Sequence, residues 1–342
     1  GWSYGVSSTW IGIGNAVIGS LIPFFLMGRR TRLMSNHLNA KTMPEFFEYR
    51  FDSKGLKTVS AAIVFIFLIP YTASVYNGLS NLFNMVFDLG EHGATYIIIA
   101  MAILSAVYVT LGGYKATSLN DFVQGIIMLI GIATVVVLTV QKKNGISAAV
   151  DALNLIPDDK GNTGTLGSIF GPDPFNLLGV VILTSLGTWG LPQMVQKFYA
   201  IKDESAIKKG TIISTIFALI VAGGCYFLGG FGRLFADQID LKAGGYDSII
   251  PAMLSGLPDI LIGIVVILVL SASMSTLSSL VLTSSSTITI DLVNEAKKKK
   301  MSDKSQVLLM RVLIVVFIAL SVIIAIVQYK SNVTFIAQLM GI

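Results

Sequence analysis

The chain has 342 residues, of which 54% are hydrophobic and 13% are charged, and its mean hydropathy is +0.76. This composition excludes a soluble globular domain and indicates an all-α polytopic membrane protein. The formal net charge of +5 does not indicate nucleic-acid binding, because the basic residues fall in loops between apolar runs, where they set membrane orientation.

The few cysteines and histidines exclude two further classes. Cys225 is the single cysteine, so no internal disulfide can form, and His37 and His92 are the only histidines. The sequence therefore offers no Cys/His cluster for zinc or haem, and metal enzymes are disfavoured.

Apolar runs of about 20 residues predict eight membrane-spanning helices. Their approximate bounds are 6–27, 58–80, 94–112, 118–140, 175–197, 209–231, 259–288 and 308–329, and a ninth run begins near Asn332. Of the 24 Lys and Arg, 18 fall in the alternate loops 28–57, 113–117, 197–209 and 291–311. This asymmetry predicts that these loops face the cytoplasm, that Gly1 lies outside, and that the run Lys297–Lys300 contacts lipid headgroups.

Short helices are predicted in the loops. Residues 42–51 hold Pro44 near the start and several aromatic residues, which is typical of an amphipathic helix lying along the membrane. The outer loops 141–174 and 232–258 leave room for short helices over 146–155 and 246–254, which are candidate lids for an external vestibule.

Two prolines predict interruptions of the spans. Pro70, followed by Tyr71, predicts a break in the second span. In the fifth span, Gly187 to Pro192 predicts a kink or opening beside Trp189. Backbone carbonyls freed inside a bilayer need protein, water or a ligand, so this break is a candidate solute position, and a proline kink with no ligand remains the alternative.

Asp121 is the one carboxylate of the chain that lies inside a predicted span. Burial of a carboxylate there costs about 2.5–3.5 kcal/mol on insertion scales, so Asp121 is expected to face a wet cavity or a partner such as Lys115. One interpretation is a structural ion pair, or a helix N-cap formed by Ser118, Asn120 or Asp121. The other is a place on an ion pathway.

Hydroxyl side chains gather at 271–289, within an apolar segment that holds no charged residue from Leu261 to Ile290. On a helix, Ala272, Ser275, Thr276, Ser279 and Thr283 share one face. Neutral hard oxygens of this kind suit an alkali cation. Small residues also allow close helix packing, and Ser and Thr can bond back to their own helix, so packing is the alternative.

These residues resemble the sodium/solute symporter family, which includes sodium/proline-type symporters. The resemblance covers nearly the whole chain and rests on three motifs in order: Thr42–Phe47; Gly112-Gly113-Tyr114 with Asp121–Gln124; and Met274–Ser278 followed by Ser285, Thr287 and Asp291-Leu292. It implies a LeuT-type fold of five plus five helices in inverted repeats. One transporter domain over 1–342 is expected, with most of the first repeat in 1–140 and most of the second in 175–342.

The resemblance also implies the site residues. The Na⁺ site falls on the backbone carbonyl of Ala272 and the hydroxyls of Ser275 and Thr276, and Asp121 falls on the inner ion pathway. Solute contacts fall on Tyr71, Thr184, Thr188, Trp189 and Pro192. Thr184 and Thr188 stand where proline transporters have Trp and Tyr. The chain therefore departs from the proline-transporter pattern at residues expected to contact the solute.

The family pattern places the broken first core helix before the position of Gly1, and the chain begins without Met and ends within an apolar run. The sequence is therefore expected to be a fragment of a longer plasma-membrane protein that lacks the first core helix.

The expected function is symport of Na⁺ with a small organic solute, such as the amino acid proline, by alternating access. The membrane-spanning segments hold few titratable groups, which favours Na⁺ over H⁺ coupling. An H⁺-coupled symporter and a solute-binding sensor on the same fold remain alternatives. A channel would need the hydroxyl face repeated around an axis, and an intramembrane serine hydrolase would need a base beside Ser275, so both are disfavoured.

Overall fold

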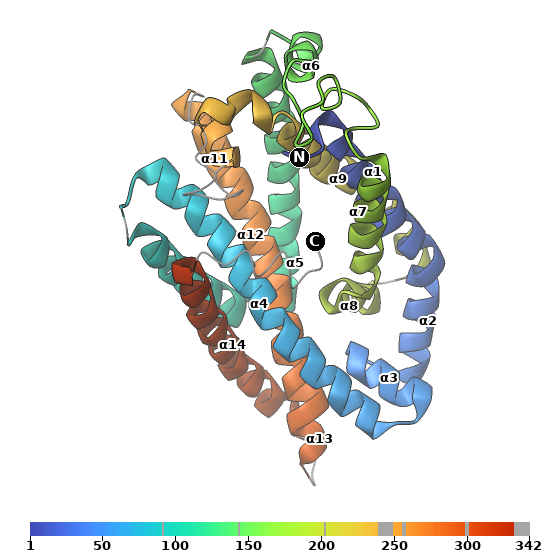
Figure 1. The fold of residues 1–342 in the computed structure, drawn as a ribbon. Coiled ribbons are helices and arrows are strands. Elements are labelled where there is room, and N and C mark those ends of the chain that lie inside the picture. Colours follow the sequence, from blue (N-terminus) through green and yellow to red (C-terminus); the bar gives the residue numbers. More distant parts are fainter. Residues whose placement is uncertain are drawn as a thin grey trace. The chain divides into compact units, whose positions relative to one another are not determined.

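A computed structural model of the chain describes residues 1–90, 92–142, 144–201, 203–238, 249–254, 258–297 and 301–331. These residues form helices joined by turns and loops, and within these ranges no strand occurs. Figure 1 shows their course. The helices are η1 Gly5–Ser8, α1 Thr9–Ala16, η2 Val17–Leu21, η3 Phe24–Gly28, α2 Arg29–Leu38, α3 Met43–Phe51, α4 Lys54–Phe87, α5 Gly93–Lys142, α6 Ile146–Asn154, α7 Pro174–Gly187, η4 Thr188–Gly190, α8 Pro192–Ala200, α9 Glu204–Gly230, η5 Gly232–Gln238, α11 Ile249–Leu254, α12 Asp259–Thr287, η7 Ile288–Val293, α13 Asn294–Ala296 and α14 Asp303–Ser331.

Six of the described helical runs are long and apolar enough to cross a membrane, and the pair α7 and α8 passes as one broken span. The predicted spans 94–112 and 118–140 both lie in α5, which has a non-helical residue at Gly113 (φ +58°, ψ −169°). At about 1.5 Å per residue, a helix of this length far exceeds the roughly 30 Å of a bilayer core, so α5 supplies two crossings that meet at Gly113. The ninth predicted run, from Asn332, lies outside the described residues, as do Lys298–Lys300.

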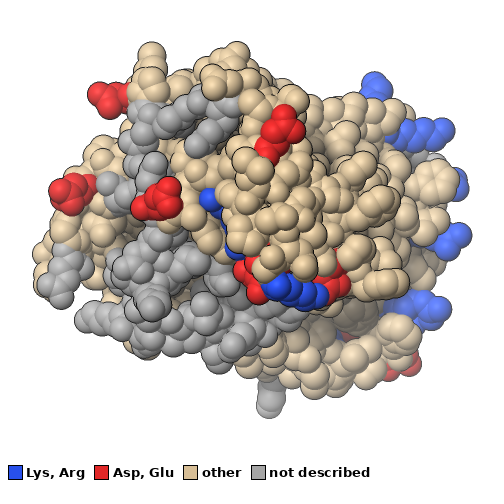
Figure 2. Space-filling view, turned by 45° about the horizontal axis from the view of Figure 1, so that its top comes forward, with Lys and Arg blue, Asp and Glu red and all other residues tan. Residues whose placement is uncertain are grey.

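The surface fits a lipid environment. Large apolar side chains are exposed on several of the long helices, among them Leu111 of α5, Ile213 of α9 and Leu308 of α14. Figure 2 shows a face that carries mostly uncharged side chains with few Lys, Arg, Asp and Glu. A soluble domain rarely exposes contiguous apolar surface on this scale, so these faces are suited to contact with acyl chains.

The chain divides into two compact units, and the first comprises residues 1–27, 125–189 and 204–269. In it α1 packs on α7 and α9. A Cβ atom on Gly12 would lie 2.5 Å from the Cα of Gly223, so glycine is required where α1 and α9 approach most closely. On the other side of α1, Ile11 packs with Leu177 and Val181 of α7 in a buried cluster.

The second unit comprises residues 28–124, 190–203 and the chain from 270 onward. Its helices α4 and α14 lie side by side (Figure 1), with the ring centroids of Phe65 and Phe317 5.6 Å apart. The helix α3 begins as predicted: Thr42 caps it by accepting the Glu45 N–H, and Pro44 stands in its first turn.

Two predicted loop helices are present. The helix α6 matches the prediction over 146–155 to within one residue. The helix α11 covers the second half of the prediction over 246–254, and residues 246–248 lie outside the described part of the chain.

The predicted break at Pro70 is wrong, because α4 continues through it from Lys54 to Phe87. Proline removes one backbone donor, which a long helix packed against its neighbours tolerates. Hydroxyls also bond to the backbone here: Thr72 Oγ1 donates to the Leu68 carbonyl at 2.8 Å, and Ser74 Oγ donates to the Tyr71 carbonyl at 2.7 Å. Tyr71 therefore stands on an unbroken helix.

Candidate ion and solute sites

The predicted Na⁺ residues lie on one partly exposed face of α12, within the second unit. Ala272, Ser275 and Thr276 are half-buried, whereas Leu277 and Leu280 on the other side of the helix are fully buried. The predicted spacing is thus realised as a face of small and hydroxyl side chains. This face is thus partly accessible, whereas the opposite side of the helix forms the apolar packing.

Two of the predicted Na⁺ oxygens adjoin each other. Thr276 Oγ1 donates to the Ala272 carbonyl oxygen at 2.9 Å. A bond of a hydroxyl to its own helix is what the packing interpretation predicts. It leaves lone pairs on both oxygens, so it is equally compatible with a bound cation.

Asp121 lies beside this face. Ser278 Oγ donates to Asp121 Oδ1 at 3.4 Å, and Ser275 is also close enough to interact with the carboxylate. The structure therefore brings the carboxylate predicted for the ion pathway next to a hydroxyl predicted for the ion site.

Asp121 was predicted to interact with Lys115, but the structure places a different lysine near it. Lys197 of α8 acts on the carboxylate electrostatically, whereas Lys115 is exposed. The N-cap alternative is also wrong. The helix resumes directly after Gly113, and Ser118 Oγ donates to the Tyr114 carbonyl at 2.9 Å, so Ser118 and Asp121 lie in the helix interior.

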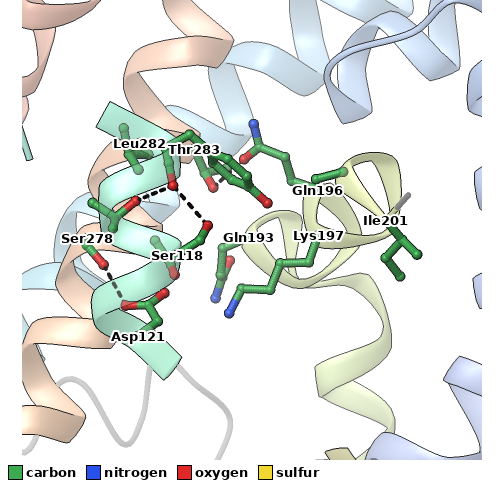
Figure 3. Close-up of a pocket in the computed structure, with 13 residues that line it drawn as sticks. Ser118, Asp121, Gln193, Gln196, Lys197, Ile201, Ser278, Leu282 and Thr283 are labelled. Atoms are coloured by element: carbon green, nitrogen blue, oxygen red, sulfur yellow. Dashed lines mark hydrogen bonds between the residues drawn. The ribbon is translucent and has the colours of Figure 1, made fainter. Parts of the chain in front are cut away.

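A pocket of about 480 Å³ opens in front of Asp121, between α5, α8 and α12 (Figure 3). The helix α8 contributes Gln193, Gln196 and Lys197, which point toward the other two helices. Gln196 is held on both sides: its Oε1 accepts from Thr283 Oγ1 at 2.6 Å, and its Nε2 donates to Ser286 Oγ at 3.2 Å. These two bonds fasten α8 to α12.

The predicted break in the fifth span is confirmed. The helix α7 ends at Gly187, a 3₁₀ turn follows, and α8 begins at Pro192, where a missing N–H is harmless. The break falls at the boundary between the two units, with Trp189 in the first and Pro192 in the second.

The predicted solute residues around the break are already engaged by the protein. Within the first unit, Trp189 Nε1 donates to the Ile18 carbonyl at 2.7 Å, and Thr188 Oγ1 donates to the Gly19 carbonyl at 3.0 Å. Both acceptors belong to η2, a π-helical segment. Thr184 Oγ1 donates within α7, to the Val180 carbonyl at 2.8 Å.

Tyr71 and Pro192 belong to the second unit, and Thr184, Thr188 and Trp189 to the first. The five predicted solute residues are thus divided between the units.

Two groups of residues were not predicted from the sequence. Lys197 was counted only as a loop charge, although Gln193, Gln196 and Lys197 follow the i, i+3, i+4 spacing of one helix face. The second group lies where α3 and α4 meet η7. Thr42 Oγ1 donates to Asp291 Oδ1 at 2.7 Å, and the buried Lys57 pairs with Glu48 at 2.8 Å.

Comparisons with known proteins identify the family and the fold of the chain. The model of the Sodium:solute symporter family matches residues 1–341. A sodium/proline symporter of Staphylococcus aureus and one of its strain JH9 are each 29% identical over 332 residues. The alignment covers 94% of this chain and 62% of either relative, so the chain spans less than two thirds of their length.

A solved structure shows the fold. It is the substrate-bound, outward-open state of a Na⁺-coupled sialic acid symporter, which matches all of this chain and 77% of its own with a TM-score of 0.68 at 16% identity. The chain therefore has the LeuT-type fold of a multi-pass integral protein of the plasma membrane. Because the family model matches residues 1–341 of the chain, the chain belongs to the sodium:solute symporter family.

Proposed function

We propose that the full-length protein is a symporter that moves a small organic solute together with Na⁺ by alternating access. The observation that carries this proposal is the juxtaposition of the hydroxyl face of α12 and Asp121, where Ser278 donates to the carboxylate at 3.4 Å. Membership of a family of transporters supports it. A family of transporters does not favour an enzyme.

The proposed ion site consists of the Ala272 carbonyl oxygen and the hydroxyl oxygens of Ser275 and Thr276. Three neutral hard oxygens suit Na⁺. Asp121 is then the next oxygen ligand on the way to the cytoplasmic side, to which the positive-inside rule assigns the preceding loop 113–117. A membrane potential that is negative inside adds about 2.3 kcal/mol per charge per 100 mV to this movement.

The proposed solute is a small amino acid such as proline. Similarity to proteins named sodium/proline symporters supports this choice. The proposed contacts are Tyr71, Thr184, Thr188, Trp189 and Pro192. The indole of Trp189 is held by the Ile18 carbonyl, so it is fixed in orientation before any solute arrives.

The inverted repeats over 1–140 and 175–342 within one transporter domain form part of this proposal. Na⁺ and solute would each raise the affinity of the protein for the other, as linkage requires. An H⁺-coupled symporter would instead respond to a pH gradient, and a sensor would bind solute without moving it.

The test is uptake of labelled L-proline and other amino acids and sugars by proteoliposomes that hold the full-length protein under an imposed Na⁺ gradient. The double variant Ser275→Ala with Thr276→Ala removes both proposed side-chain oxygens. We expect Na⁺-driven uptake to fall at least tenfold in this variant, because two of three proposed ligands are lost.

The matched control is Ser273→Ala, which removes a buried hydroxyl from another side of the same helix. It should keep Na⁺-driven uptake within about twofold, because this hydroxyl lies outside the proposed set of Na⁺ ligands. Uptake that is unchanged by the Na⁺ gradient and by the double substitution would contradict the proposed ion site. The hydroxyl face of α12 would then be a packing surface. Uptake driven by a pH gradient would favour H⁺ coupling.

A further inference from the structure

The pocket in front of Asp121 contains both signs of charge. Its lining includes the carboxylate of Asp121 and the ammonium of Lys197, which reach into it from α5 and α8 (Figure 3). In the described part of the chain no ion pair joins these two side chains, although Lys197 acts on Asp121 electrostatically. The pocket thus has no net charge but a strong internal dipole.

Gln193 supplies a second, independent sign of a ligand. Its side chain lines the pocket and is only 7% exposed, yet its Oε1 atom has no hydrogen-bond partner among the described residues. A buried carbonyl oxygen without a donor is uncommon and calls for one. Gln196, three residues later, has both ends of its amide bonded, so of these two pocket glutamines only Gln193 has an open acceptor.

These groups select among ligand classes. A lone cation would meet the Lys197 ammonium, and a lone anion would meet the Asp121 carboxylate. A sugar would satisfy the polar groups but would offer no opposite charge to either Asp121 or Lys197. A small molecule with one ammonium and one carboxylate matches the pocket at every point.

We propose that this pocket binds a small zwitterionic amino acid, with the solute carboxylate at Lys197 and the solute ammonium at Asp121 and Gln193 Oε1. The volume of about 480 Å³ lies within the range of small-molecule sites, roughly 300–1,000 Å³. Because the pocket borders residues 113–117 and 197–209, which are predicted to lie on the cytoplasmic side, it is a site from which the solute leaves. This inference rests on the proposed function.

Asp121 serves two ligands in this scheme. When the solute carboxylate occupies Lys197, the positive field of that side chain at Asp121 is reduced. The solute ammonium neutralises the Asp121 carboxylate at the same time, so Na⁺ and the solute compete for this side chain. Na⁺ and the solute ammonium use Asp121 in turn.

The test measures occupancy of the pocket directly. Cys225 and any cysteine that the full-length protein has outside this chain are replaced by Ser, and Ser279, which lines the pocket, is replaced by Cys. The rate of maleimide labelling of the full-length protein is then measured in Na⁺-free buffer. The probes are L-proline, L-alanine and L-serine, together with L-prolinamide, which lacks the carboxylate, and tetrahydrofuran-2-carboxylate, which lacks the ammonium.

We expect at least one of the three amino acids at millimolar concentration to slow labelling at least threefold, and neither analogue to do so. Equal protection by an amino acid and an analogue, or no protection by any amino acid, would overturn the proposal. This comparison needs no change at Lys197, so it holds even if a variant there fails to fold.

Variants then assign the charge. Lys197→Met should abolish protection and Lys197→Arg should keep it, whereas Lys115→Met, which removes a nearby exposed ammonium outside the pocket, should have no effect. Protection that survives in Lys197→Met contradicts the assignment. Na⁺-driven uptake without charge-dependent protection would overturn this pocket alone, and charge-dependent protection without Na⁺-driven uptake would overturn the proposed symport alone.

Discussion

The carboxylate of Asp158 organises the loop that precedes α7. Asp158 Oδ1 accepts the backbone N–H groups of Lys160 and Asn162 at 2.8 and 2.9 Å, and Oδ2 accepts from Thr165 Oγ1 at 3.0 Å. These hydrogen bonds, above all that from the Asn162 N–H, hold the pKa of the Asp158 carboxyl below its ordinary value. The loop in turn reaches the N-terminal segment, where the Val6 N–H donates to the Leu166 carbonyl at 2.9 Å.

The lowered pKa predicts how the loop responds to pH. The ionised carboxylate stabilises the loop at every pH above its unfolded pKa of about 3.9, and this stabilisation is lost as the pH falls through the lower folded-state pKa. We expect Asp158→Ala to speed amide exchange of Lys160 and Asn162 several-fold at pH 7, after correction for intrinsic rates. Hydrogen exchange with mass spectrometry measures this. Asp151→Ala, at an exposed position of α6, should leave exchange unchanged, and equal rates in both variants would contradict the prediction.

At the scale of helices, two irregular segments stabilise each other within the first unit. The π-helical register of η2 leaves carbonyl oxygens without their usual partners. Thr188 and Trp189 donate to two of them, at 3.0 and 2.7 Å. The end of α7 thus satisfies the backbone of the first span, so the π segment and the break after α7 form one hydrogen-bonded element.

This pairing predicts a cost for removing the indole donor. Trp189→Phe keeps an aromatic ring but leaves the Ile18 carbonyl without its partner, which is expected to cost about 1–3 kcal/mol. Thermal unfolding of the purified protein at a fixed scan rate measures the loss. Trp10→Phe is the matched control, because Trp10 Nε1 also donates to a carbonyl, that of Ile169, but the side chain is exposed. A larger loss of thermal stability in Trp10→Phe than in Trp189→Phe would show that the hydrogen bond from Trp189 to the Ile18 carbonyl is unimportant.

Gly113 allows α5 to change direction. The effect of replacing it on the free energy of unfolding can be distinguished from an effect of side-chain packing. A Cβ atom there would meet nothing within 4 Å, but φ is +58°. With ψ at −169°, this backbone conformation is one that essentially only glycine adopts, so Gly113→Ala should destabilise the protein by about 1–3 kcal/mol through backbone strain alone. Gly78→Ala is also unobstructed but helical, so it should be neutral or stabilising by up to about 1 kcal/mol. The melting temperatures of the Gly113→Ala and Gly78→Ala variants measure this difference. Equal shifts in the two variants would exclude backbone strain as the cause.

At the scale of the whole molecule, hydropathy was sufficient to predict the spans, because the bilayer imposes a minimum length on each apolar run. It was not sufficient for Pro70, since a proline inside a span signals a break only when the neighbouring packing does not compensate. Lys197 was missed for a related reason. A charge near the end of a span looks like an orientation signal, and only the pairing of α8 with α12 through Gln196 turns it inward.

The grouping of Ser275 with Asp121 also required the structure, because 153 residues of sequence separate them and no local pattern links the two. Both residues belong to the motifs that carry the family resemblance, but only the packing of the helices brings them close together. The roles proposed for the Na⁺ and solute residues remain predictions.

The chain passes between its two units five times, after residues 27, 124, 189, 203 and 269. Three of these passages lie within about one helical turn of residues proposed to handle ion or solute: Asp121, Trp189 and Ala272. The backbone at these three passages therefore lies close in sequence to the proposed ligand residues. A substitution that restricts the backbone dihedral angles at one passage is expected to shift the neighbouring ligand residue without contacting a ligand.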